Sequence, residues 1–167
     1  QLSPKAQRKI GVLLEKDSEF DAAYEAYSTY LAKYPDGTDF DSSVDSMFRI
    51  AKLFLDGQKR KVFGVPIASS MTRAQEMFEG IVKRAPFSRQ APLAQFNLGR
   101  CLEKQGKFPE AIQAYQQCVS KYPGDAIADD AQYQLGYVLL RQSREGSYDR
   151  AASVKAREAF EDFVNRY

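Results

Sequence analysis

The chain has 167 residues and a formal net charge of +2, with 24 basic and 22 acidic residues. This balance argues against nonspecific nucleic-acid binding, which relies on concentrated positive charge. Histidine is absent and the only cysteines are Cys101 and Cys118, so we expect no zinc site of the usual kind and no cofactor. The sequence also lacks a Ser/His/Asp set and a phosphate-binding glycine loop, which argues against an enzyme.

The first predicted helical hairpin covers 4–35. Ser3 and Pro4 are typical of a helix start, because serine caps a helix and proline suits its first turn. The second helix carries four tyrosines, listed here: Tyr24, Tyr27, Tyr30 and Tyr34. We interpret this row chiefly as packing between repeats, with the hydroxyls reaching water, and a binding surface is the weaker alternative. Pro35 then ends the hairpin, because proline cannot continue the ladder of backbone hydrogen bonds.

The second predicted hairpin covers 42–86 and contains an insertion, 56–70. Three basic residues in a row precede an apolar tip, Val62–Ile67. The sequence supports two interpretations of this insertion equally well. It is either a surface loop whose apolar tip packs back onto the helices or a loop that binds a partner. The residues of the second interpretation are Lys59, Arg60, Lys61, Phe63 and Val65.

The third and fourth predicted hairpins cover 90–123 and 127–167. In the third, Gly106 lies in the turn and Pro123 ends the second helix. The fourth contains an insertion, 141–152, which is polar and charged. That insertion either extends the flanking helices or forms a solvated loop.

Each hairpin places a small residue in its first helix and an alanine in its second. Twelve residues separate Gly11 from Ala23, and twelve also separate Gly99 from Ala111. Small residues at this separation allow two antiparallel helices to approach closely. The recurrence resembles the tetratricopeptide repeat and implies an all-α fold, a right-handed solenoid of about four hairpins in a single domain, 1–167.

Cys101 and Cys118 fall on opposite helices of the third hairpin. We favour two buried thiols that act as small apolar side chains, because free cysteine is among the most buried residue types. The alternative is a disulfide that joins the two helices in an oxidising compartment.

In a helical-repeat stack the first helix of each hairpin lines the concave side. We therefore predict a peptide-binding groove from the residues opposite the packed face, which are aromatic or basic. They are Arg8, Phe48, Arg49, Lys52, Phe96, Arg100, Lys104, Tyr133 and Tyr137. Such a groove suits an extended peptide that carries aromatic side chains and carboxylates. Packing between adjacent hairpins is favoured for Phe48, Phe96 and Tyr133, and binding is favoured for the three cations Arg49, Lys52 and Arg100.

A finer resemblance involves the whole of 47–86, MFRIAKLFLDGQKRKVFGVPIASSMTRAQEMFEGIVKRAP, and the segments APFSRQAPLAQFNLG and KYPGDAIADDAQYQLGYVLL. They resemble the BamD-type outer-membrane assembly lipoproteins, and the F-G-V insertion is the part that goes beyond generic repeats. The resemblance implies a periplasmic scaffold held at the outer membrane by an N-terminal lipid anchor. Its implied partners are a barrel-assembly subunit and unfolded outer-membrane protein peptides that end in an aromatic residue and a carboxylate.

This chain departs from that family in lacking the lipid-bearing cysteine and in having four repeats where five are usual. The alternatives are a periplasmic repeat protein of the cell-envelope constriction or cell-wall machinery, and a generic repeat adaptor. An enzyme with a helical accessory region would need catalytic residues outside this sequence.

Overall fold

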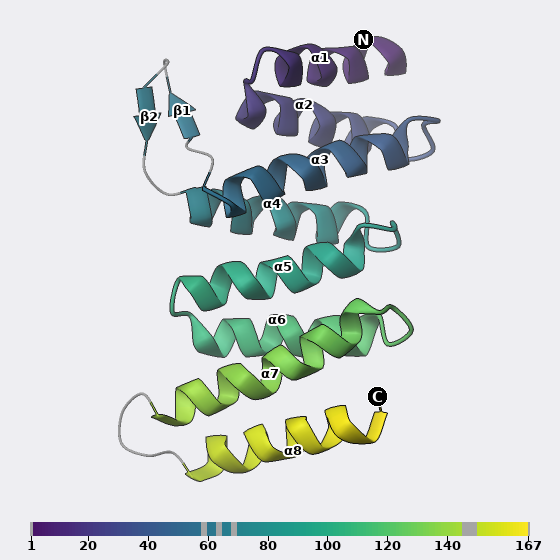
Figure 1. Cartoon of the computed structure of the whole chain (residues 1–167). Helices are drawn as coiled ribbons and strands as arrows, with labels where there is room; N and C mark the ends of the chain where they lie inside the picture. The colour runs from purple at the N-terminus through teal and green to yellow at the C-terminus, as the bar shows by residue number, and fades with distance from the viewer. Residues whose placement is uncertain (1, 58–59, 63–64, 68–69, 145–149, 167) are drawn as a thin grey trace. The chain divides into compact units, whose positions relative to one another are not determined.

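The computed structural model describes residues 2–57, 60–62, 65–67, 70–144 and 150–166. Within these ranges the chain forms helices joined by short turns, as the ribbon in Figure 1 shows. The helices are α1 Pro4–Lys16, α2 Phe20–Lys33, α3 Phe40–Leu55, α4 Ser70–Arg84, α5 Ala91–Lys104, α6 Phe108–Lys121, α7 Ile127–Arg144 and α8 Arg150–Arg166. They pair as α1–α2, α3–α4, α5–α6 and α7–α8, which confirms the predicted all-α fold of helical hairpins.

The first insertion differs from the predicted loop. Its described residues form two short antiparallel strands, β1 Arg60–Val62 and β2 Val65–Ile67, with Arg60 opposite Ile67. The β-branched residues Val62, Val65 and Ile67 favour a strand over an irregular loop here. Of the predicted partner-binding residues, Arg60, Lys61 and Val65 lie in these strands, whereas Lys59 and Phe63 lie outside the described residues.

The second insertion extends the helices on both sides. Residues 141–144 complete α7, and residues 150–152 begin α8. The described part of the insertion therefore agrees with the first alternative, extension of the flanking helices.

The chain divides into two compact units, Gln1–Ala94 and Gln95–Tyr167. In the first unit, α2 packs against α1 and against α3, and α3 packs against α4. In the second unit, α7 packs against both α6 and α8. The division falls within α5, and the prediction of a single domain, 1–167, stays a prediction.

Close approach within a hairpin depends on the small residue of its first helix. A Cβ atom built on Gly11 would lie 2.7 Å from Cε1 of Tyr27, and one built on Gly99 would lie 2.6 Å from Cε1 of Tyr115. The aromatic ring of the second helix therefore lies directly on the glycine. This confirms the predicted close approach and identifies the ring as the group for which the small residue leaves room.

Two buried glutamines join the helices of the later hairpins. The Gln95 side-chain amide donates to the Ala114 carbonyl at 3.0 Å, and the Gln132 amide donates to the Ala159 carbonyl at 3.0 Å. Each glutamine lies four residues before the small residue of its helix. Because a buried polar group is costly without a partner, these bonds fix the register of the two helices.

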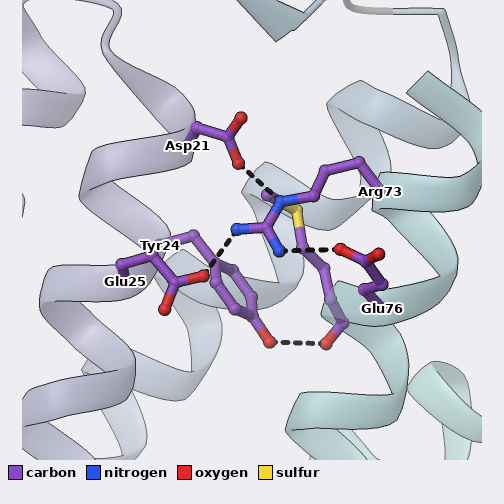
Figure 2. Close-up of polar contacts among 6 residues, drawn as sticks. Asp21, Tyr24, Glu25, Arg73 and Glu76 are labelled. Carbon is purple, nitrogen blue, oxygen red and sulfur yellow. Dashed lines mark hydrogen bonds and ion pairs between the residues drawn. The ribbon is translucent and has the colours of Figure 1, made fainter. Parts of the chain in front are cut away.

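Helices α2 and α4 are joined by a cluster around Arg73. As Figure 2 shows, its guanidinium donates to Asp21 at 2.5 Å, to Glu25 at 2.6 Å and to Glu76 at 3.0 Å. The guanidinium also lies 5.6 Å from the centre of the Tyr24 ring. Burial alone would lower the pKa of Arg73, but the hydrogen bonds that it donates to the three carboxylates raise the pKa overall. Arg73 therefore keeps its charge and holds the first two hairpins together.

The tyrosines of α2 serve mainly in packing, as favoured from the sequence. The expectation that their hydroxyls reach water is wrong for Tyr24 and Tyr27, which bond to other helices, and the Tyr27 ring packs on Gly11 within its own hairpin. Tyr24, Tyr27 and Tyr30 are at most 3% exposed. The Tyr24 hydroxyl donates to the Met77 carbonyl at 2.6 Å. The polar end of a buried ring thus finds a partner on another helix.

Both cysteines are fully buried, and among the described residues no disulfide joins them. Burial raises the pKa of the Cys118 thiol to about 12, with a smaller contribution from Asp125. The structure therefore agrees with the favoured interpretation, two buried thiols that pack as small apolar groups.

Candidate peptide-binding surface

Positions on the first helix of each hairpin are compared by counting from the small residue, Gly11, Ala51, Gly99 or Gly136. The residues three before, one after and five after this position are spaced by four and so share one helix face. We call this face the first-helix stripe. In the first unit it consists of Arg8, Val12, Lys16, Phe48, Lys52 and Asp56. In the second unit it consists of Phe96, Arg100, Lys104, Tyr133, Tyr137 and Arg141.

The aromatic residue at the start of the stripe packs on a ring of the second helix. The ring centres are 5.8 Å apart for Phe48 and Phe78, and 5.6 Å apart for Phe96 and Tyr115. Tyr133 packs similarly on Phe160 at 5.8 Å. Packing was favoured for Phe48, Phe96 and Tyr133, but we expected it between adjacent hairpins. The structure corrects this, because each of these ring pairs lies within one hairpin.

Packing leaves part of the tyrosine rings at the surface. Tyr133 is 50% exposed and Tyr137 is 42% exposed. The Tyr133 ring is held by Phe160 and Phe163, and a half-exposed aromatic ring that is held in position is well suited to contact a partner, because little conformational entropy is lost on binding.

Basic side chains accompany these rings. Lys52 and Lys104 are exposed, and Arg100 is half-buried. The Arg100 guanidinium donates to the Asn97 side-chain oxygen at 3.2 Å, which orients it along the helix. In the second unit the stripe therefore carries aromatic and cationic groups side by side.

A carboxylate connects the first helices of the second unit. Glu103 accepts hydrogen bonds from the Tyr115 hydroxyl at 3.0 Å and from the Gln134 amide at 2.8 Å, and lies 3.7 Å from Arg141. These contacts connect α5 to α7, the two helices that carry the stripe of this unit, and the negative charge of Glu103 is shared among three donors.

The first unit has a related arrangement, and it corrects the assignment of Arg49. Glu15 accepts from the Tyr27 hydroxyl at 3.0 Å and forms an ion pair with Arg49. Arg49 lies two residues before Ala51, which turns its side chain from the stripe toward α1. The Arg8 guanidinium lies 3.7 Å from Asp39. Both predicted arginines of this unit are therefore already paired with carboxylates of the same chain.

Burial determines the state of the tyrosine in this arrangement. Desolvation raises the pKa of Tyr115, and the nearby Glu103 carboxylate raises it further. The phenol therefore stays protonated near neutral pH and donates to the carboxylate. This bond fixes the ring on which Phe96 packs.

One exposed aromatic residue was missed by the sequence analysis. Phe87 lies in the turn between α4 and α5, is 99% exposed and borders a hollow of about 280 Å³ with Val44 of α3. A comparison of the turn sequences would have identified Phe87 as a candidate. The residue after the turn proline is Asp36 in one turn and Gly124 in another, so a phenylalanine at this position is unusual.

The described part of the chain contains no group of three or more His, Cys, Asp or Glu residues placed to hold a metal ion. Within the same part, every helix is too short or too polar to cross a membrane.

Comparison with known proteins supports the repeat assignment. One tetratricopeptide-repeat family model matches residues 70–126, and a second matches residues 5–37. No curated protein matches the sequence. Neither comparison by family model nor by structure indicates an enzyme family.

Several solved structures have a similar fold. A structure of MamA protein gives a TM-score of 0.55 at 22% identity and covers 97% of this chain and 72% of that one. MamA from Desulfovibrio magneticus RS-1 gives 0.54 at 16% identity, covering 98% of this chain and 75% of that one. The apo form of RapI gives 0.53 at 14% identity, covering 97% of this chain and 57% of that one. At these identities the likeness shows the fold alone. The two repeat matches and the helical hairpins of the structure together show that the chain contains tetratricopeptide repeats.

Proposed function

We propose that this chain is a noncatalytic scaffold that binds an extended peptide through the first-helix stripe of its second unit. The observation that carries this proposal is the combination of exposed rings with cations on α5 and α7. Tyr133 and Tyr137 offer aromatic contact area, while Arg100 and Lys104 offer donors for a carboxylate. A peptide that ends in an aromatic residue and a free carboxylate matches both.

The test measures binding of a fluorescently labelled peptide that ends in Phe-COO⁻, compared with the same peptide carrying a C-terminal amide. We expect the double variant Arg100→Glu, Lys104→Glu to weaken binding of the carboxylate peptide by at least about tenfold, because two attractive charges become repulsive. Added salt should weaken wild-type binding in the same direction. Lys121→Glu, an exposed position at the end of α6, changes one charge away from the stripe and serves as the control.

Equal affinity of wild type and double variant for the carboxylate peptide would refute the carboxylate assignment. Equal affinity of the wild type for the carboxylate and amide peptides would also refute the carboxylate assignment. A Tyr137→Ala variant tests the aromatic half separately, since its ring is 42% exposed and its removal should leave the fold intact.

We further propose that the partner is part of outer-membrane β-barrel protein assembly, and that the protein acts in the periplasm. This rests on the resemblance of 47–86 and its F-G-V insertion to the BamD-type lipoproteins. A pulldown from detergent-solubilised envelope, with the native protein as bait, should recover the barrel-forming subunit. Deletion of 59–67 should reduce that recovery if the insertion contacts the subunit.

A generic repeat adaptor is the second candidate. It is favoured by the family-model matches, which identify the repeats themselves and nothing more specific. Recovery of a partner unrelated to barrel assembly, with the stripe still required, would support this candidate and exclude the first.

A further inference from the structure

A small hollow lies in the first unit, between the start of α3 and the turn that joins α4 to α5. These two segments lie at the same end of their hairpins (Figure 1). The hollow has a volume of about 280 Å³, and its lining comes from α3 and from residues 87–90 of the turn. Sites for small-molecule ligands usually measure ~300–1,000 Å³, so this hollow suits a single side chain of a partner better than a separate ligand.

Helix α3 supplies one wall of the hollow. Asp41, Val44 and Asp45 are three and four residues apart, so they share one face of the helix. Val44 is only 1% exposed and contributes apolar surface at the base. The Asp41 side chain is exposed, and no cation of the described part of the chain pairs with it. One carboxylate of the hollow is therefore available to a partner.

The turn supplies the opposite wall, and it leaves one acceptor unused. Asp45 accepts hydrogen bonds from Arg89 at 3.1 Å and from the Gln90 side-chain amide at 2.8 Å. Because a carboxylate only accepts, Gln90 must turn its amide nitrogen to Asp45 and its oxygen elsewhere. That oxygen, Oε1, is buried, and nothing in the described part of the chain donates to it. A donor from a bound partner would therefore be stabilising.

Phe87 stands at the edge of the same hollow. Its ring is 99% exposed, and a large apolar ring gains free energy when a partner covers it. The repeat itself does not require this ring, since the equivalent residues of the other two turns are Asp36 and Gly124. The hollow thus combines a free carboxylate, a buried acceptor and an uncovered aromatic face in one turn.

We propose that this hollow binds an arginine side chain of a partner protein. Its lining holds two carboxylates and one guanidinium, so one negative charge remains for an incoming cation. The planar arginine fork can donate to Asp41 and to Gln90 Oε1 while it lies on the Phe87 ring. Lysine carries the same charge but lacks the planar fork and the flat stacking surface. The inference is independent of the proposed function, because the stripe of the second unit is cationic and recognises a carboxylate.

The experiment is an NMR titration of the isotope-labelled full chain with a blocked pentapeptide that has arginine between glycines. Both peptide termini are capped, so the guanidinium carries its only charge. We expect saturable shifts of the backbone amides of 41–45 and 87–90. A matched peptide with citrulline, which is uncharged but similar in shape, should bind at least about tenfold more weakly. A matched lysine peptide should bind about threefold more weakly than the arginine peptide.

Variants test each wall of the hollow. Asp41→Asn should weaken binding of the arginine peptide by at least about threefold, because the paired charge is lost. Phe87→Ser should weaken it by a similar factor, because the ring face is lost. Both side chains are exposed, so these substitutions should leave the fold intact. Asp36→Asn is the matched control, since it removes an exposed carboxylate outside the hollow and should bind like wild type.

Equal affinity for the arginine and citrulline peptides would overturn the proposal, as would shifts spread over the whole surface. An equal effect of Asp41→Asn and Asp36→Asn would also overturn it, because it would show a general effect of net charge. Equal affinity for the arginine and lysine peptides would refute the assignment to arginine. These outcomes are distinct from a failure of the stripe, which is tested with a carboxylate peptide and with variants in the second unit.

Discussion

The contact between Gly99 and Tyr115 predicts that Gly99→Ala destabilises the protein, although alanine is the better helix former. The added Cβ would lie 2.6 Å from ring carbon Cε1, and ordinary contact begins at 3.4 Å, so the ring must move by about 0.8 Å. The ring is held from both sides, since Phe96 packs on it and its hydroxyl is bonded to Glu103 at 3.0 Å. Moving it therefore disturbs more than one contact.

The change in the free energy of unfolding follows from two costs and one gain. Overpacking costs ~1–3 kcal/mol. Loss of the phenol hydrogen bond costs ~1 kcal/mol. The helix propensity of alanine over glycine returns ~1 kcal/mol. We therefore expect Gly99→Ala to lower the free energy of unfolding by ~1–3 kcal/mol, measured by urea denaturation followed by circular dichroism.

A graded series separates crowding from propensity. Gly136→Ala should cost less than Gly99→Ala, because its Cβ would lie 2.9 Å from Phe160, a ring without a hydroxyl to hold it. Gly124→Ala, with nothing within 4 Å of the new Cβ, should be close to neutral. In a Tyr115→Phe background, Gly99→Ala should cost less than in the wild type. A Gly99→Ala variant as stable as the wild type would refute the idea that the glycine is required by the ring.

Three further outcomes follow from the contacts described. Arg73→Met should lower the free energy of unfolding by ~1–3 kcal/mol in urea denaturation, because it leaves the partly buried Asp21 carboxylate without its cation. Glu76→Gln removes an exposed partner and should cost under ~1 kcal/mol, and equal effects of the two variants would refute the role of Arg73. Burial raises the pKa of Cys118 from 9.0 to about 12, so its contribution to stability is complete below pH 9 and is lost as the pH rises toward 12. The urea midpoint should therefore fall over this range, and fall less in Cys118→Ala; an equal fall in both would contradict this. Phe87→Ser should leave the melting temperature within about 1 °C of wild type but reduce partner recovery, and unchanged recovery would show that this exposed ring is not a contact.

The fold was accessible from the sequence because its determinants are local. The spacing from Gly99 to Ala111, the turn at Gly106 and the stop at Pro123 lie within one hairpin, and the pattern repeats along the chain. Repeat folds are built from contacts between neighbours, so a local pattern defines most of the packing. The contact between Gly99 and the Tyr115 ring refines the packing that the sequence predicts, but it does not change the number or order of the helices.

The candidate site was less predictable because it depends on helical phase and on distant partners. Arg49 and Phe48 are adjacent in sequence, yet a step of one residue rotates the side chain by about 100°. Arg49 consequently meets Glu15, which lies 34 residues away, and no local pattern reports that pairing. The aromatic residues were assigned to packing, but the sequence could not indicate whether their partner ring was in the same hairpin or the next.

The carboxylates Glu15 and Glu103 also have a consequence for how the repeats assemble. They alternate with leucine at the same position, Leu55 and Leu140, so successive hairpins are chemically different where the next first helix approaches. A mispaired hairpin would leave Glu15 without Arg49, or Glu103 without Gln134, and an unmatched carboxylate in a partly buried site is costly. A chain built from similar repeats can pair the wrong hairpins during folding, and we expect these two carboxylates to disfavour such mispairing.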